Sequence, residues 1–141
     1  MAKQVLTNVN VTFGTANTDI SAYVASVALT LSAAEVATTA FGTANAVTRI
    51  QGLRDHSVTL SMHQDYPTIE KLFYDAFQNG TSVPMTIKPN GTAAAGSTQP
   101  SYSMNVLSVG YSPVNGAVGD LATFDITLPV DGGVTKTGTG A

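Results

Sequence analysis

The sequence contains no cysteine and no tryptophan, and charged residues make up only 11% of its 141 positions. The absence of cysteine excludes disulfide bonds and thiolate metal sites. The six basic side chains are scattered and the formal net charge is -3, so the chain lacks the basic patch typical of nucleic-acid binding. This low charge favours surfaces that neighbouring subunits cover, although a neutral, threonine-rich monomer would have a similar composition.

Long apolar runs are also absent. Residues 1–20 lack the apolar segment of a signal peptide, and no stretch approaches the length of a membrane-spanning helix. We therefore expect the protein to be made in a cytoplasm, to remain there until it assembles, and to have no membrane partner.

Residue types that form catalytic or metal sites are few and poorly spaced for chemistry. His56 and His63 would point to opposite faces of one strand, so they could not share a metal there. Asp65, Glu70 and Asp75 are five residues apart and would not stack on one helix face. The glycines lack the Lys-Ser/Thr ending of a phosphate loop, and no serine lies in a Gly-x-Ser-x-Gly motif. We expect no catalytic residue, no metal, no cofactor and no enzymatic activity.

Alternation of apolar and polar residues predicts a single, mainly β domain over residues 1–130. The clearest case is the segment from His56 to Gln64, in which Val58, Leu60 and Met62 share one face. A change of register near Leu107 suggests a bulge. Strands are expected at residues 4–13, 24–31, 34–41 (or a short β-arm), 56–64, 83–88, 102–111 and 122–128.

One amphipathic helix is expected at about residues 66–78. Its apolar residues recur at helical spacing from Ile69 to Phe77. Asp65 can cap its start and Gly80 can end it. Together with the strands, this predicts a β-sandwich or half-barrel with one flanking helix packed on an outer face.

Three segments are expected to lie outside this sandwich. Residues 42–56 form a long loop, and long ordered loops are usually functional. Residues 89–100 form a surface loop rich in Gly, Ala and Thr. Residues 131–141 form a flexible tail, or an arm that becomes ordered only on a neighbour.

The 42–56 loop carries Arg49 and Arg54 close to Asp55. One interpretation is a loop pinned to its own domain by a surface salt bridge, which contributes about 0–1 kcal/mol. The other is a loop that docks on the next subunit through Ile50 and Leu53, with arginine as a favoured interface residue. The residues alone leave both open. The candidate interface residues are Phe41, Arg49, Ile50, Leu53, Arg54 and Asp55.

Several segments along nearly the whole chain point to one protein family. They are Asp19-Ile-Ser-Ala-Tyr-Val, Thr38-Thr-Ala-Phe-Gly, Arg49 with Gly52-Leu-Arg-Asp, Gln64-Asp65 before the helix, and Tyr111-Ser-Pro-Val-Asn-Gly-Ala-Val-Gly-Asp-Leu-Ala-Thr-Phe. In these segments the chain resembles the major tail tube proteins of long-tailed, siphovirus-type bacteriophages.

This resemblance implies a structural virion protein located in the phage tail. Six subunits would form a ring whose inner strands join into one β-barrel, and stacked rings would form the tube that conducts DNA during ejection. The long loop would reach an adjacent ring. Implied partners are further copies of the chain, the tape measure protein, and tail tip or terminator proteins, while DNA passes without specific binding. Asp120 and Asp125 would face the lumen if the last strand is an inner one.

Two alternatives remain open at this point. Another virion β protein, such as a tail terminator or a head decoration protein, would form a single ring or a trimer. A carbohydrate-binding β-sandwich is disfavoured, because such modules usually expose planar aromatic side chains and this chain has no Trp and only five dispersed Tyr.

Overall fold

The computed structural model describes residues 5–42, 45–89 and 100–137. A short 3-10 turn, η1 (Ser21–Tyr23), precedes β3, and a π-helical turn, η2 (Tyr66–Glu70), leads into α1 (Lys71–Asn79). The strands are β1 (Asn10–Phe13), β2 (Thr18–Asp19), β3 (Val24–Thr30), β4 (Ala33–Ala37), β5 (Arg49–Arg54), β6 (Ser57–His63), β7 (Val83–Lys88), β8 (Ser101–Val106), β9 (Thr123–Pro129) and β10 (Thr135–Thr137).

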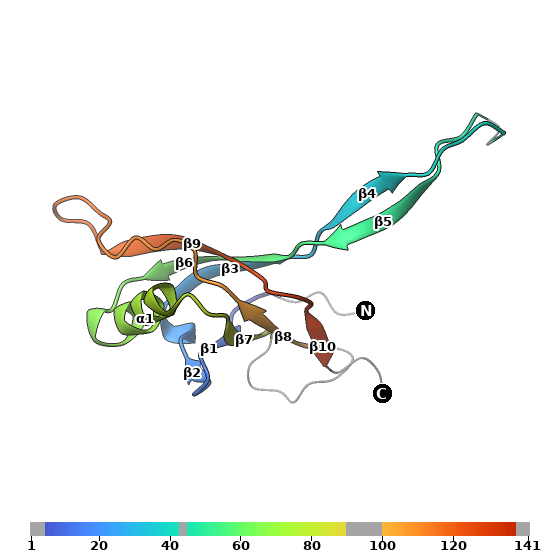
Figure 1. The fold of residues 1–141 in the computed structure, drawn as a ribbon. Helices are drawn as coiled ribbons and strands as arrows, with labels where there is room; N and C mark the ends of the chain where they lie inside the picture. The colour runs from blue at the N-terminus through green and yellow to red at the C-terminus, as the bar shows by residue number, and fades with distance from the viewer. Residues whose placement is uncertain (1–4, 43–44, 90–99, 138–141) are drawn as a thin grey trace.

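The strands form two antiparallel sheets and a separate two-stranded ribbon. One sheet has the order β10-β8-β7-β1-β2, the second has the order β3-β6-β9, and β4 pairs with β5 (Figure 1). The predicted mainly β class is therefore confirmed. The sheets lie one above the other, and the β4–β5 ribbon extends away from them.

The core lies between the two sheets. On β6 the inward side chains of Val58, Leu60 and Met62 are fully buried, as the alternation predicted, and β9 supplies a matching buried row. Burying each large apolar side chain stabilises the fold by about 1.5–3 kcal/mol. The buried apolar residues are Val11, Phe13, Ile20, Val58, Leu60, Met62, Ile69, Phe73, Ala76, Met85, Ile87, Met104, Val106, Phe124, Ile126 and Leu128.

The predicted helix is present, and it packs at the side of the sandwich where both sheets meet it. The Phe73 ring lies 4.6 Å from the Phe13 ring of β1 and 5.8 Å from the Phe124 ring of β9. Because one helical side chain contacts both sheets, the helix does not pack on an outer face of the sandwich, where the sequence predicted it. Gly80 ends the helix with a φ of 67°, in the left-handed region that glycine adopts without strain.

The expected cap by the Asp65 side chain is wrong. The Asp65 side chain makes no capping hydrogen bond, while its backbone carbonyl accepts from the N–H groups of Ile69 and Glu70 at 2.9 and 3.1 Å. The carboxylate instead accepts a hydrogen bond from the Tyr23 hydroxyl, which raises the pKa of Tyr23. Asp65 therefore ties the start of the helix to the turn before β3.

The segment expected to be a loop at residues 42–56 contains a strand. Arg49–Arg54 is β5, and it pairs with β4 within the expected 34–41 strand or arm. The 42–56 loop prediction is wrong for these residues because their backbone groups are paired across the ribbon.

Three further boundaries differ from expectation. The first strand begins at Asn10 and not at residue 4. The expected bulge near Leu107 does not form, because β8 ends at Val106 and the Leu107 N–H donates instead to the Pro129 carbonyl at 2.9 Å. Thr135–Thr137 of the expected flexible tail pairs with β8 as β10. Most of the expected 89–100 loop lies outside the described residues.

Candidate subunit interface

The β4–β5 ribbon is the continuation of the β3–β6 pair. Thr30 lies opposite Ser57 and, three residues further on each strand, Ala33 lies opposite Arg54, so the register is unchanged. Between these pairs the Asp55 N–H donates to the Ser32 carbonyl at 2.8 Å. We call residues 33–54 the arm. Its strands are anchored to the core through the strands that they extend, and it projects from the sandwich (Figure 1).

A bulge changes the register within the arm. Ala33 pairs with Arg54 but Glu35 pairs with Gln51, so two residues of β5 lie opposite one residue of β4. Gly52 occupies this position, where a Cβ would lie 3.0 Å from Val36 Cγ2 and 3.3 Å from the Ala34 carbonyl oxygen. A larger residue would require Val36 and Ala34 to move by a few tenths of an ångström, so close packing favours glycine here.

One face of the arm is polar. Arg49 forms an ion pair with Glu35 across the two strands, and both side chains are more than half exposed. Arg54 Nε donates to Gln51 Oε1 at 3.2 Å. Such exposed pairs contribute at most about 1 kcal/mol to stability.

The other face of the arm is apolar and open to solvent. Val36 lies directly opposite Ile50, and both are exposed. Leu53 at the bulge is 87% exposed. A two-stranded ribbon is marginally stable alone in water, and an uncovered apolar row on it favours a second surface that covers it.

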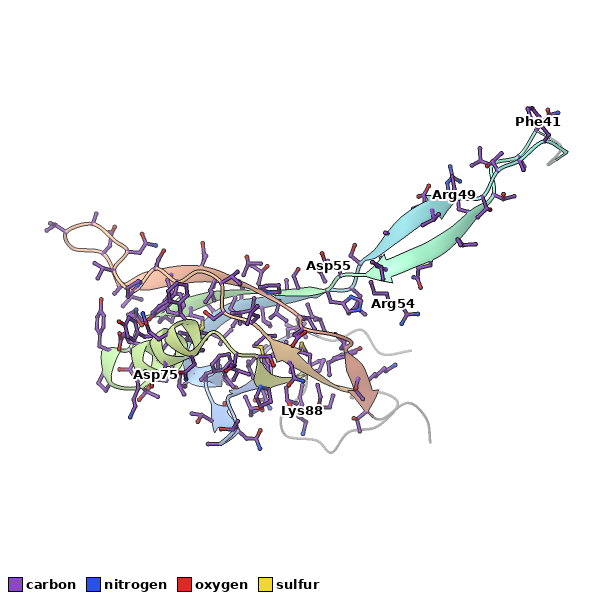
Figure 2. The ribbon with its side chains drawn as sticks, viewed as in Figure 1. Phe41, Arg49, Arg54, Asp55, Asp75 and Lys88 are labelled. Atoms are coloured by element: carbon purple, nitrogen blue, oxygen red, sulfur yellow. The ribbon has the colours of Figure 1, made fainter. Side chains whose placement is uncertain are left out.

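The tip of the arm is uncharged. Thr38 and Thr48 are joined by a backbone bond of 2.8 Å and by a hydroxyl–hydroxyl bond of 2.8 Å. Beyond them the Phe41 side chain is fully exposed, and Figure 2 shows it at the far end of the arm. Val47 is also exposed there.

The candidate interface residues therefore lie along one structural element. Figure 2 shows Phe41 at the tip of the arm, Arg49 along it, and Arg54 and Asp55 at its base. Arg49 pairs with Glu35 on β4 within the arm, rather than with Asp55, the acidic residue that the sequence placed near it. Glu35 and Val36 lie in the segment expected to be a strand or a short β-arm, but sequence reasoning did not name them or Val47 as candidate interface residues. The available signal was the apolar residue between polar ones in Arg49–Gln51, which pairs with Glu35 and Val36 and so indicates a two-stranded ribbon.

A hollow of about 630 Å³ lies at the base of the arm. Leu31 lines it from the segment between β3 and β4, Leu53 lines it from β5, and Gly133 and Val134 line it from the segment before β10. His56 also lines it, with Nδ1 accepting from the Ser32 N–H at 3.2 Å. His63 lies at the far end of β6, opposite Thr123. Within the described ranges, no group of three or more His, Asp or Glu residues could hold a metal ion.

The outward face of the β3-β6-β9 sheet is a second candidate surface. Most of its cross-strand rows consist of Ser, Thr and Ala, with His63 opposite Thr123 at one end. Asp125 is the acidic side chain among them, in line with Ser26 and Ser61. Asp120 does not share this face. It lies in the loop before β9, where its N–H donates to the Ala117 carbonyl at 3.1 Å. The two acidic residues proposed together for the lumen are thus on different elements.

Searches with the sequence give no match to a protein-family model or to a curated protein. In the part of the chain that the structure describes, no helix is long and apolar enough to span a membrane. Solved structures do match. A chain from the virion of a native gene transfer agent particle aligns with a TM-score of 0.77 at 12% identity, covering 96% of this chain and 99% of that one. A chain from the baseplate of the anti-feeding prophage aligns with a TM-score of 0.63 at 13% identity, covering 100% of both. The protein thus has the fold of chains found in these particles.

Proposed function

We propose that the protein is a structural subunit of a long-tailed phage tail, and that it forms six-membered rings that stack into the tail tube. The arm carries this proposal. It exposes an apolar face and an uncharged tip, and it is joined to the core through the continuous β3–β6 register. A monomer gains no stability from such an extension, whereas an assembly gains a contact between subunits. The similar folds in two phage-related particles support the same assignment.

The outward face of the β3-β6-β9 sheet fits the wall of a DNA conduit. It carries mainly Ser, Thr and Ala side chains with Asp125, has His63 at one end, and none of its residues on these strands is Lys or Arg. Phosphate contacts require cationic side chains, so this face should let DNA pass without binding it. Asp125 then faces the lumen, and Asp120, in the loop before β9, does not share that face.

The outer edge of β3 fits the join between neighbours in a ring. In the described part of the chain, β3 has β6 as its only ladder partner, and its sequence from Val24 to Thr30 contains no charge and no proline. An uncharged free edge invites pairing with another strand. A repeated head-to-tail contact closes into a ring when its rotation allows, and such closure would cover the β3 edge in every subunit.

In this role the protein resides in the virion tail and has no catalytic function. Its partners are copies of itself, a tape measure protein inside the tube, and tail tip or terminator proteins at the ends. The arm makes the contact between rings. Its apolar residues Phe41, Ile50 and Leu53 form this contact, flanked by Arg49 and Arg54 on the polar face and by Asp55 at the base of the arm.

Electron microscopy of the purified protein at increasing concentration, with size-exclusion chromatography in parallel, tests the proposal. We expect hollow filaments of uniform width that arise from monomers or single rings. Closed rings or trimers that never stack would instead identify a terminator or a head decoration protein.

A further inference from the structure

A second exposed apolar surface lies at the end of the molecule opposite the arm. It belongs to the segment between β8 and β9, which we call the distal loop (residues 107–122). Figure 1 shows it projecting beyond the sandwich on the side away from the arm. Four aliphatic side chains of this loop are exposed: Val109 at 60%, Val114 at 83%, Val118 at 105% and Leu121 at 65%.

The base of the distal loop is held in place by hydrogen bonds. Gln64 Nε2 donates to the Pro113 carbonyl and to the Tyr111 hydroxyl, both at 2.9 Å. The Tyr66 hydroxyl donates to the same Pro113 carbonyl at 3.1 Å. Burial raises the pKa of Tyr111, and its ring packs 5.2 Å from Phe124 in the core. The loop therefore presents its aliphatic residues from a base fixed to both β6 and β9.

The distal loop and the arm tip match in polarity. Asp120 is the one charged residue in the sequence of the loop, and the described arm-tip residues 38–42 and 45–48 contain none. Contact between the distal loop and the arm tip would bury apolar surface. It would desolvate few charged groups, and the desolvation of charges is costly when an interface forms.

We propose that the distal loop receives the arm tip of a subunit in the adjacent ring. Because one chain carries both surfaces at opposite ends, each subunit can bind one copy ahead and one behind. A contact between two different surfaces that does not close on itself extends without limit, which is the geometry of stacked rings. The inference rests on the proposed function and adds the receiving surface.

The absence of cysteine makes a direct test possible. The variant with both Phe41→Cys and Val118→Cys is assembled into filaments, oxidised and run on a denaturing gel without reductant. We expect a regular ladder of covalent multimers, because each subunit would be linked to the next through two different cysteines. The variant with Val47→Cys and Leu121→Cys tests a second pair across the same contact.

Matched controls distinguish this contact from random collision. Each single-cysteine variant can form dimers at most. The control variant joins Phe41→Cys with Tyr74→Cys, which is 45% exposed on α1, and it should give no ladder. A ladder of equal strength in the control, or filaments in which neither test pair crosslinks, would overturn the inference and leave the tube intact. A protein that forms no filament at any concentration would overturn the proposed function as well.

Discussion

Removal of the arm should abolish assembly and leave the fold intact. The strand register sets the ends of the deletion. Ser32 and Asp55 lie opposite each other, and the Asp55 N–H donates to the Ser32 carbonyl at 2.8 Å. Replacing residues 33–54 by Asn-Gly would close the ribbon with a two-residue turn that suits antiparallel strands. Both partners of the bond between His56 and the Ser32 N–H are kept.

The expected change in stability is small. Among the described residues, every side chain of the buried apolar core lies outside the deleted segment. The deletion removes an exposed ion pair, which contributes at most about 1 kcal/mol, and a ribbon that is marginal by itself. We therefore expect the free energy of unfolding to change by less than about 1 kcal/mol, and Tm by less than about 8 °C.

Circular dichroism melting, size-exclusion chromatography and electron microscopy of the deletion variant provide the assay. We expect cooperative melting near the Tm of the full chain and no filaments. Filaments of normal length would show that the arm is not the contact between rings. Loss of cooperative melting would show that the arm is part of the folding unit.

A pair of point variants separates the two faces of the arm. Ile50→Asp places a charge on the apolar face and should block stacking at concentrations where the full chain forms filaments. Gln51→Asp places the same charge on the polar face, opposite Glu35 and beside Arg54, and should leave stacking unchanged. Equal loss in both variants, measured by filament pelleting, would contradict the assignment of the apolar face as the contact.

Three further predictions concern the core, the pH response and the lumen. Phe73→Ala should destabilise the fold by about 3–5 kcal/mol in chemical denaturation, because the ring is fully buried, whereas Phe77→Ala, at 44% exposed, should cost much less. Asp19→Asn should lower stability at pH 7, since hydrogen bonds from the Ser21 side chain and N–H hold the pKa of Asp19 below 3.8; the difference from the full chain should vanish as the pH falls through that lowered value. Asp125→Lys filaments should bind labelled single-stranded DNA in an anisotropy assay, and Asp75→Lys filaments, altered on the helix, should bind it much more weakly.

Strong local patterns allowed the sandwich to be predicted. The alternation of Val58, Leu60 and Met62 corresponds to one buried row because β6 is the middle strand of its sheet and every second residue meets the core. The helix was predicted because its apolar stripe, including Phe73, meets the core at helical spacing. In both cases a local period reflects contact with one continuous apolar surface.

The arm was missed in part because its pattern is interrupted. The bulge at Gly52 changes the register, so the alternation in Arg49–Gln51 does not continue into β6 as a single period. The same glycine suggests a loop when read in the sequence, although close approach to Val36 and Ala34 is the reason for it. Thr135–Thr137 gave no local signal at all, because its order comes from pairing with distant β8.

The low charge of the chain and its shape have a common explanation in the proposed assembly. The outward face of β3-β6-β9, the apolar face of the arm and the distal loop carry few charges, and each would be covered by a neighbour or would line the lumen. Burying charged groups between subunits costs desolvation energy unless they are paired. Solubility of the free subunit must then come from surfaces that stay exposed. The outer side of the helix, with Lys71 and Asp75 both exposed, is such a surface. In a tube whose wall is the β3-β6-β9 sheet, the helix would lie on the outside, where its charges remain in water after every ring has formed.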